Sequence, residues 1–366
     1  MAQQHLDPRN STAVTAEALA GYLRSQATEF LRALRTHRET GGGGGGAPTR
    51  AQPRTGESGA EESADAALAL RRSARRISGT LHTFRPLLDA DWSESLRPEL
   101  AWLSGTLGRE HAYAARLDRL VLALNRLSGA AAGLPAQTGA TVAGRTAGAE
   151  RAGPATPDRG NLTIGAAKAG ALLDRQLTLA RTRAHSAALQ ALGSSRFHAV
   201  ADSVAVLASE VPLTPTASAL DLRPLAAAAH DRLRDAVAGL PLLTAGHPYN
   251  AEALVHGLSP DTAPHPQDAP WHQVRLLLRL HRYALEVLHP QAVPVDVRLL
   301  AAGEALNRHR YASEAAAAAA AAARTPRIAP ATAYALGVLH ADQRHEVEAA
   351  RFAFQQSWQK ETVSTS

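Results

Sequence analysis

Apolar residues recur at helical spacing along most of this chain, and Ala and Leu dominate them. Aromatic residues make up only 4% of the chain and β-branched residues are sparse, so local propensity favours helix almost everywhere. The 366 residues, of which 45% are hydrophobic, are enough to bury a large core. We therefore predict an all-α protein with one large domain or two modest ones.

Two low-complexity stretches interrupt the helical pattern. Residues 40–63 contain six consecutive glycines among Pro, Ser and charged residues, which predicts a flexible linker. Residues 129–160 are rich in Gly, Ala, Thr and Pro and are predicted to form a flexible loop. These stretches separate an N-terminal helical half, 15–128, from a C-terminal helical half, 161–358. The glycines match GxGxxG, but no strand precedes them, so a dinucleotide site is disfavoured.

Within the two halves, blocks of helical periodicity are separated by Pro-containing turns. We expect helices at 15–37, 64–127 with a break near 86–91, 162–209, 218–240, 269–289, 294–324 and 328–360.

The two halves contain segments of similar sequence. LALRRSARRISGTLHTFRP, residues 68–86, aligns without gaps with HQVRLLLRLHRYALEVLHP, residues 272–290. The identical pairs are Arg71 with Arg275, Arg75 with Arg279, Leu81 with Leu285 and Pro86 with Pro290. A second match, 107–114 with 306–313, follows in the same order at nearly the same separation. Two matches in register indicate a duplicated helical unit.

The first of these segments has one cationic face when it is wound as an α-helix. Its basic and polar side chains fall within about 80° of one another, and the apolar side chains occupy the opposite side. The cationic face contains Arg71, Arg75, Ser78, His82 and Arg85, flanked by Arg72 and Arg76. At 1.5 Å per residue the row rises by roughly 21 Å, which suits an extended anion better than a single small one.

The second segment carries a similar stripe on an otherwise apolar helix. The stripe consists of His272, Arg275, Arg279, Arg282 and Glu286. Because the other faces are so apolar, we expect the stripe to face a wet groove inside the fold. Two such rows would form a basic groove whose guanidiniums bind anionic oxygens in pairs. The alternative is that these arginines merely solvate exposed helix faces, and Tyr283 either packs in the core or donates a hydrogen bond to a ligand.

The overall charge is consistent with a polyanionic ligand. The chain has 39 Lys and Arg against 33 Asp and Glu, and nearly every cation is Arg, which pairs bidentately with phosphate. No P-loop, HExxH, GxSxG or EF-hand spacing is present, so we predict neither a cofactor nor catalytic residues and no enzyme activity. His247, His256 and His265 recur every nine residues, but a solvated loop is favoured over a metal site.

Cellular location follows from what the sequence lacks. The chain has no cysteine, which excludes disulfides and thiolate sites and is compatible with a reducing cytosol. No apolar run approaches the roughly 20 residues that span a bilayer, and no secretory signal is visible. We predict a cytoplasmic protein with no membrane partner.

The basic segments resemble the motifs of the CHAD family, the conserved-histidine α-helical domains. RRSARRISGTLHTFRPLLD, residues 71–89, resembles the first motif, and WHQVRLLLRLHRYALEVL, residues 271–288, the second. Further family-like stretches lie at 96–111, 183–213 and 326–358. The resemblance implies two pseudo-repeated bundles of about four helices each around a basic central groove that binds inorganic polyphosphate, often at polyphosphate granules.

The resemblance also shows where this chain departs from the motifs. The histidine expected three residues before Arg71 is Leu68, and an arginine expected at 78 is Ser78. Positions that are basic in many members are Leu276 and Leu280 here. Acidic positions in the helix after each motif are replaced by Ala112 and Tyr311.

We therefore predict a non-enzymatic protein that binds inorganic polyphosphate. The predicted ligand-binding residues are Arg71, Arg75, Arg76, His82, Arg85, His272, Arg275, Arg279 and Arg282, with Arg72, His281, Tyr283 and Arg310 as secondary candidates. The alternative is a degenerate helical scaffold or granule-associated interaction protein that has lost phosphate binding. Nucleic acid is disfavoured because few aromatic residues are present to stack on bases, and an enzyme acting on a phosphorylated small molecule is a further alternative. The oligomeric state cannot be read from the sequence.

Overall fold

The structure is a computed structural model that describes residues 16–41, 56–129, 158–247, 258, 265–289 and 296–359. The α-helices are α1 (Ala16–Gly41), α2 (Gly56–Thr83), α3 (Ala90–Leu127), α4 (Asp158–Leu192), α5 (Ser195–Ser209), α6 (Arg223–Ala238), α7 (Leu242–Ala245), α9 (Ala269–Leu288), α10 (Val297–Ala323) and α11 (Pro330–Gln359). These residues contain no β-strand, only an isolated bridge between Leu88 and Leu213. The all-α prediction is confirmed.

Two of the helix boundaries lie at turn-forming or capping residues of the sequence. The expected break after the first basic segment is a short 3-10 turn, Arg85–Leu87, which contains Pro86 and precedes α3. The single helix expected at 162–209 is instead two helices. Ser194 separates them, because its side-chain oxygen accepts a hydrogen bond from the backbone N–H of Phe197 at 3.2 Å and so caps α5.

Both low-complexity stretches contain more helix than their composition predicts. α1 continues to Gly41 and α2 begins at Gly56, so the predicted linker 40–63 is helical at both ends. α4 likewise begins at Asp158, within the predicted loop 129–160. Glu and Ala between the glycines and serines of 56–63 favour a helical first turn, which the composition average conceals. The remainder of each stretch lies outside the described residues.

The chain divides into two compact units, and neither is a continuous half. Unit 1 comprises 1–110, 182–240 and 270–303, and unit 2 comprises 111–181, 241–269 and 304–366. The helices α3, α4 and α10 each contribute one part to each unit. Each unit therefore draws on both of the predicted halves.

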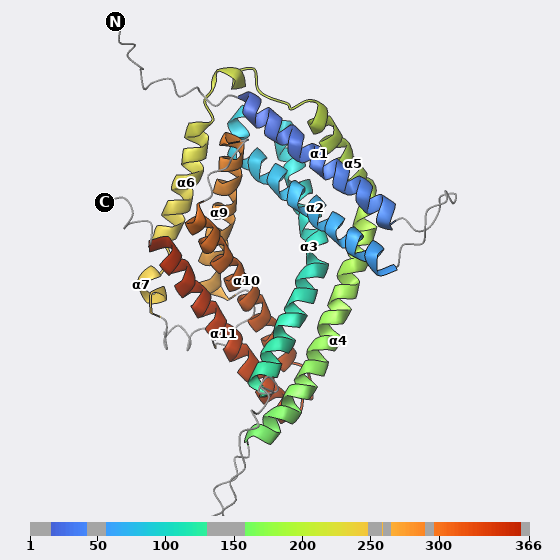
Figure 1. The fold of residues 1–366 in the computed structure, drawn as a ribbon, viewed down its shortest axis with the longest axis vertical. Helices are drawn as coiled ribbons and strands as arrows, with labels where there is room; N and C mark the ends of the chain where they lie inside the picture. Colours follow the sequence, from blue (N-terminus) through green and yellow to red (C-terminus); the bar gives the residue numbers. More distant parts are fainter. Residues whose placement is uncertain are drawn as a thin grey trace, which may run out of the picture. The chain divides into compact units, whose positions relative to one another are not determined.

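The core of unit 1 is built on the apolar side of the first basic segment. α1 lies along α2 and α5 (Figure 1). Ile77, Leu81 and Phe84, which the helical wheel places opposite the arginines, are completely buried. α9 adds Trp271 and Val274, also buried, to unit 1. Packing of these faces fixes the rotation of α2 and α9 and therefore where their basic stripes point.

Unit 2 has a separate core made of Leu and Ala. Its members come from α3, α4, α10 and α11, and include Leu120, Leu124, Ala169, Leu173, Ala315, Ala319, Leu336 and Leu339. The alanine run in α10 therefore packs in this core and carries no polar chemistry. None of the described helices is long and apolar enough to cross a membrane.

Candidate functional site

Unit 1 contains a pocket of about 280 Å³ between α2, α3 and α9. The residues lining it are Arg75, Ser78, Gly79 and His82 of α2, Arg97, Ala101 and Ser104 of α3, and Leu276, Arg279, Leu280 and Tyr283 of α9. This described lining combines three arginines and a histidine and includes no aspartate or glutamate. Such a lining favours an anion, because the surrounding apolar walls strengthen the field of the cations.

The two predicted basic stripes meet at this pocket. Arg75 and Arg279, which are aligned between the two similar segments, both line the pocket. α2 and α9 approach closely there because Gly79 has no side chain. A Cβ at Gly79 would lie 2.7 Å from Cδ2 of Tyr283, its own aligned position on α9. Tyr283 therefore packs against Gly79 where the two helices cross.

Arg71 lies one helical turn before Arg75 and contacts α3. Its Nε donates to the backbone carbonyl of Ser104 at 3.2 Å, beside the pocket. Its guanidinium also lies against Gly108, where an added Cβ would be 2.5 Å from Cζ of Arg71. The small residue therefore allows the arginine to lie flat on α3.

His82 and Arg97 form a hydrogen-bonded pair in the pocket wall. Nη2 of Arg97 lies 3.0 Å from Nδ1 of His82. Because a guanidinium only donates, Nδ1 is the acceptor and the imidazole is neutral, with its proton on Nε2. Burial lowers the pKa of His82, and the charges of Arg97 and Arg232 lower it further. Nη1 of Arg97 also donates to Glu94 at 2.9 Å, and the exposed, predicted Arg85 pairs with the same carboxylate at 2.9 Å.

Arg76, although predicted as a ligand-binding residue, is engaged with a carboxylate of the protein. Its Nε and Nη2 donate to Glu286 at 2.8 and 3.3 Å, and its guanidinium lies 5.7 Å from the ring centre of Tyr283. The hydroxyl of Tyr22 donates to the same carboxylate at 2.7 Å, and burial together with Glu286 raises the pKa of Tyr22. The charge of Arg76 is therefore compensated inside the fold.

The other predicted residues of α2 and α9 are not part of the pocket lining. Half-buried His272 and Arg275 lie towards the start of α9, and Arg72 and Arg282 are exposed. Arg275 and Arg279 are separated by one helical turn, so the basic face continues from the pocket towards the N-terminus of α9.

His281 is buried away from the basic stripe. Its ring centre lies 4.7 Å from that of His230 on α6. Burial lowers the pKa of His281 to about 4, and the neighbouring His230 contributes in the same direction. The secondary prediction that His281 contacts a ligand is therefore not supported by its position; its ring packs between two helices of unit 1.

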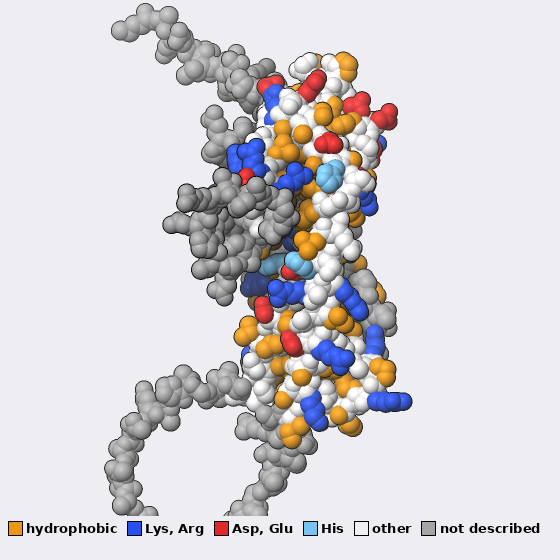
Figure 2. Space-filling view, turned by 90° about the vertical axis from the view of Figure 1, so that its right-hand side faces the viewer, with side chains coloured by type: hydrophobic (Ala, Val, Ile, Leu, Met, Phe, Trp, Pro, Cys, Tyr) orange, Lys and Arg blue, Asp and Glu red, His pale blue; other side chains and the backbone are white. Residues whose placement is uncertain are grey.

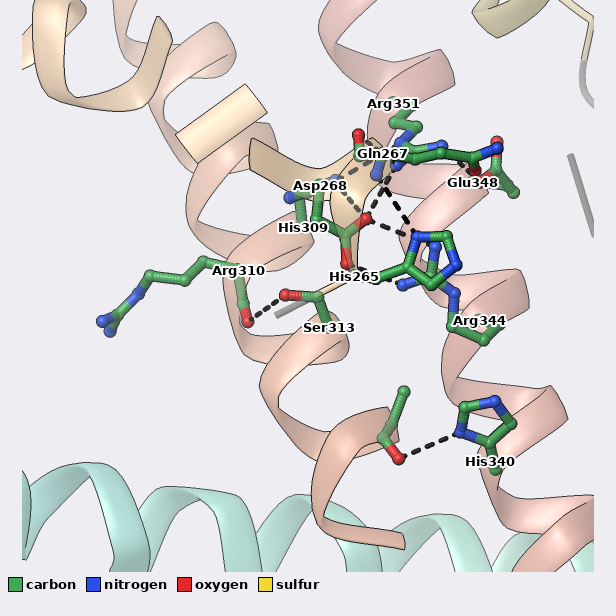
Figure 3. A network of polar contacts seen from close by, with 11 residues as sticks. His265, Gln267, Asp268, His309, Arg310, Ser313, His340, Arg344, Glu348 and Arg351 are labelled. Carbon is green, nitrogen blue, oxygen red and sulfur yellow. Dashed lines mark hydrogen bonds and ion pairs between the residues drawn. The ribbon is translucent and has the colours of Figure 1, made fainter. Parts of the chain in front are cut away.

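Unit 2 holds a second cluster of arginines, which is arranged around a carboxylate (Figure 3). Asp268, 2% exposed, accepts hydrogen bonds from Arg344 at 2.7 Å and from Arg351 at 2.7 Å. Arg351 also donates to Glu348 at 2.8 Å and to Nε2 of His309 at 3.3 Å. Burial alone raises the pKa of Asp268, but contacts with His309 and Arg344 outweigh it and hold this pKa well below its usual range.

Arg310, a secondary candidate, belongs to unit 2 and points away from the Asp268 cluster (Figure 3). Its guanidinium pairs with Glu314 at 3.3 Å and lies 4.8 Å from the ring centre of Tyr311. Basic residues of α3 in this unit are paired in the same way, for example Arg116 with Glu314 at 2.7 Å and Arg126 with Asp342 at 2.6 Å. The face in Figure 2 also shows basic side chains singly or in small groups among acidic and apolar ones. Basic composition alone therefore does not mark the site.

The face of α3 that completes the pocket was missed in the sequence. Arg97, Ala101, Ser104 and Gly108 follow one another at spacings of four, three and four residues, which places them on one side of the helix. A search for rows of cations does not detect this stripe, because only its first member is charged. A search for small residues in register with a cation would have found it.

Three of the six departures from the family motifs lie at the pocket wall. Ser78, Leu276 and Leu280 all line the pocket, and Leu276 keeps 45% of its surface exposed.

Within the described residues, no group of three or more acidic or histidine side chains is arranged to hold a metal ion. His265 instead caps a short turn by accepting from the N–H of Gln267 at 3.3 Å, and His256 lies outside the described residues.

Comparison with known proteins places this architecture in a family. The model of the CHAD domain matches residues 50–304, a range that contains every residue lining the pocket. A solved structure described as PptA from Streptomyces chartreusis is 66% identical, with a TM-score of 0.73 over 94% of this chain and 99% of that chain. No curated protein matches. The protein is a member of the CHAD family.

Proposed function

We propose that this protein binds inorganic polyphosphate, without hydrolysing it, through the pocket between α2, α3 and α9. The observation that carries the proposal is the convergence of Arg75, Arg97 and Arg279 around a space whose described lining contains no carboxylate. Membership of the CHAD family supports the choice of ligand, because the motif resemblance implies polyphosphate binding. The arginines come from three different helices, so a chain of phosphates passing between them meets guanidiniums on several sides.

In this proposal the binding surface extends beyond the pocket. Arg71 lies one turn before Arg75 on α2, and Arg275 lies one turn before Arg279 on α9. Repeating phosphates of an extended anion would reach these residues in turn, as the paired rows of the predicted basic groove require. We further propose that α2 and α9 are equivalent elements of two pseudo-repeated bundles. We do not include Arg76 and His281 among the ligand contacts. Arg76 is hydrogen-bonded to Glu286, and the ring of His281 packs against that of His230.

The scaffold alternative rests on the apolar part of the pocket. Leu276 and Leu280 stand where many family members carry basic residues, and both face the space that the anion would fill. A protein that had lost its ligand would be expected to lose cations at this position. Three arginines nevertheless remain in the lining, and apolar neighbours strengthen each guanidinium–phosphate contact by lowering the local dielectric constant.

Binding of long-chain polyphosphate, compared with single-stranded DNA of similar total charge, tests the proposal. We expect tighter binding of polyphosphate at every salt concentration. The logarithm of its association constant should fall with the logarithm of salt at a slope on the order of −2 to −3 if the three pocket guanidiniums alone displace counterions, and more steeply if Arg71 and Arg275 also do so. Equal affinity for DNA would favour the nucleic-acid alternative, and no binding of either would favour the scaffold.

Two further measurements test which residues bind the ligand and whether the protein hydrolyses it. Arg279→Ala should weaken polyphosphate binding by about tenfold or more, since hydrogen bonds to charged groups contribute about 1.5 to 3 kcal/mol. Arg24→Ala is the matched control, because it removes one exposed cation of α1 that pairs with Glu17 outside the pocket. Incubation with polyphosphate should release no phosphate above background, and release would favour an enzyme.

A further inference from the structure

We propose that Arg97 is a phosphate-binding residue of this pocket, and that its partner His82 takes up a proton when phosphate displaces the hydrogen bond between them. This inference rests on the proposed function. It adds a residue of α3 to the site and couples ligand binding to a proton.

The geometry fixes the state of the pair before ligand binds. Nη2 of Arg97 donates to Nδ1 of His82 at 3.0 Å, and both side chains line the pocket. A guanidinium and an imidazolium cannot share this hydrogen bond, because neither would have a lone pair to offer. In this hydrogen bond His82 is therefore neutral and presents an acceptor to Arg97.

A phosphate in the pocket reverses the preferences of both groups. It accepts hydrogen bonds and carries negative charge, so it competes with Nδ1 of His82 for the N–H groups of Arg97. Once Arg97 turns to the phosphate, Nδ1 is available for a proton. The imidazolium that forms adds a donor and a positive charge to the same anion.

The charges around His82 make its protonation depend on an anion. Arg97 and Glu94 face it from α3, Arg232 from α6, and Arg85 from the turn that follows α2. Arg75 and Arg279 line the same pocket. Burial and the arginines together outweigh the single carboxylate and lower the pKa of His82. Bound phosphate would offset these cations.

The sign of the coupling follows from this arrangement. The pKa of His82 is below its usual value in the free protein and rises when the anion binds. Binding therefore takes up protons in the interval between the two pKa values. Affinity for polyphosphate should increase as the pH falls through that interval and level off below the pKa of the free protein.

Calorimetric titration with long-chain polyphosphate near pH 6.5, in buffers of different ionisation enthalpy, measures the number of protons taken up. Internal phosphates of the chain remain ionised throughout this range, so the uptake reports on the protein. We expect uptake by the wild-type protein and its loss in His82→Gln, because the glutamine oxygen still accepts from Arg97 but takes no proton. His198→Gln is the matched control, since this exposed histidine of α5 bonds to the carbonyl of Ser194.

Substitution of Arg97 tests whether this residue binds phosphate. Arg97→Gln should weaken polyphosphate binding by about tenfold or more, as for loss of a hydrogen bond to a charged group. Arg196→Gln removes an exposed cation of α5 that pairs with Glu99 and does not line the pocket, and should have a much smaller effect. Equal effects of the two substitutions would overturn the assignment of Arg97.

Proton resonances of the His82 ring provide a readout that needs no variant to fold. Their pH titration should move to higher pH when polyphosphate is added. Binding without proton uptake, or with uptake that persists in His82→Gln, would overturn the inference and leave the proposed function standing. A wild-type protein that does not bind polyphosphate would instead overturn the proposed function itself.

Discussion

Arginines converge in both units of the molecule, but on different partners. In unit 2, Arg344 and Arg351 donate to the buried carboxylate of Asp268. In unit 1, Arg75 and Arg279 line a pocket of about 280 Å³ whose described lining has no carboxylate. The same side chain therefore serves as structure in the Asp268 cluster, and is suited to ligand binding where it lines a pocket without a carboxylate in its described lining.

Consecutive residues of α2 show the same contrast over a single peptide bond. Arg75 lines the pocket, whereas Arg76 donates two hydrogen bonds to Glu286. Substitution of an arginine that lines the pocket should reduce polyphosphate binding without destabilising the fold. Substitution of an arginine that pairs with a carboxylate of the protein should reduce the free energy of unfolding without changing polyphosphate binding.

Asp268→Asn should be the most damaging substitution. It removes the buried carboxylate that Arg344 and Arg351 share and leaves Arg351 with Glu348, which costs about 3 to 5 kcal/mol of unfolding free energy. Denaturant titration measures the loss, and polyphosphate affinity of the folded fraction should remain at the wild-type value. Glu17→Gln, which breaks an exposed pair on α1, is the control and should change stability little. An Asp268→Asn protein with wild-type stability would contradict the structural role of this cluster.

Mild acid should weaken unit 1 before unit 2. The pKa of His281 is about 4 in the folded protein, below its ordinary value of 6.5, so the unfolded chain binds its proton more readily. Stability is complete above pH 6.5 and falls as the pH is lowered towards 4, by up to roughly 3 kcal/mol. The pKa of Asp268 is also lowered, but from 3.8, so its contribution is lost only at still lower pH.

Hydrogen exchange at pH 7 and pH 5, corrected for intrinsic rates, resolves the two units. We expect α6 and α9, which carry His230 and His281, to lose protection first. The helices α10 and α11 around Asp268 should keep theirs. His281→Leu should remove most of the pH dependence of unit 1. Earlier loss in α10 and α11 would reverse the predicted order.

Arg76→Ala should destabilise the protein by about 1 to 2 kcal/mol, because Glu286 and Tyr22 lose a charged hydrogen-bonding partner in a half-buried site. Polyphosphate affinity, measured well below the melting temperature, should change little. Arg76→Lys keeps the charge and should recover part of the stability. Loss of binding with unchanged stability would return Arg76 to the ligand-binding set.

Leu276→Arg should produce the smallest change, and in the opposite direction. Leu276 lines the pocket and is 45% exposed, so a longer side chain has room to extend towards the ligand. An added cation should raise polyphosphate affinity by about 1 kcal/mol, or several-fold, with no loss of stability. Weaker binding would mean that the apolar wall itself contributes to the site.

Local periodicity predicted most of the helices and the rotation of α2, although it missed the division of 162–209 into α4 and α5. The apolar positions Ile77, Leu81 and Phe84 are buried as the helical wheel requires, and Arg75 and Arg279, which are aligned between the two segments, line the same pocket. Such patterns depend on residues a few positions apart. They succeed because each turn of an isolated helix already fixes its faces.

The partners of the charged residues could not be predicted in this way. Arg76 and Glu286 are 210 residues apart, and Asp268 and Arg344 are 76 residues apart. A helical wheel gives the direction of a side chain and not what faces it across the core. The two units likewise combine segments from both ends of the chain, so no composition boundary marks them.

The polyphosphate affinity of Arg75→Ala combined with Arg279→Ala tests whether the pocket between α2, α3 and α9 binds the ligand. Two lost charged contacts should weaken binding by about 100-fold or more, with wild-type melting behaviour. The control, Arg24→Ala combined with Arg196→Ala, removes the same charge from exposed pairs on α1 and α5 and should bind almost as the wild type does. Equal weakening of the two double variants, or undiminished binding by the pocket variant, would contradict the claim that this pocket is the binding site.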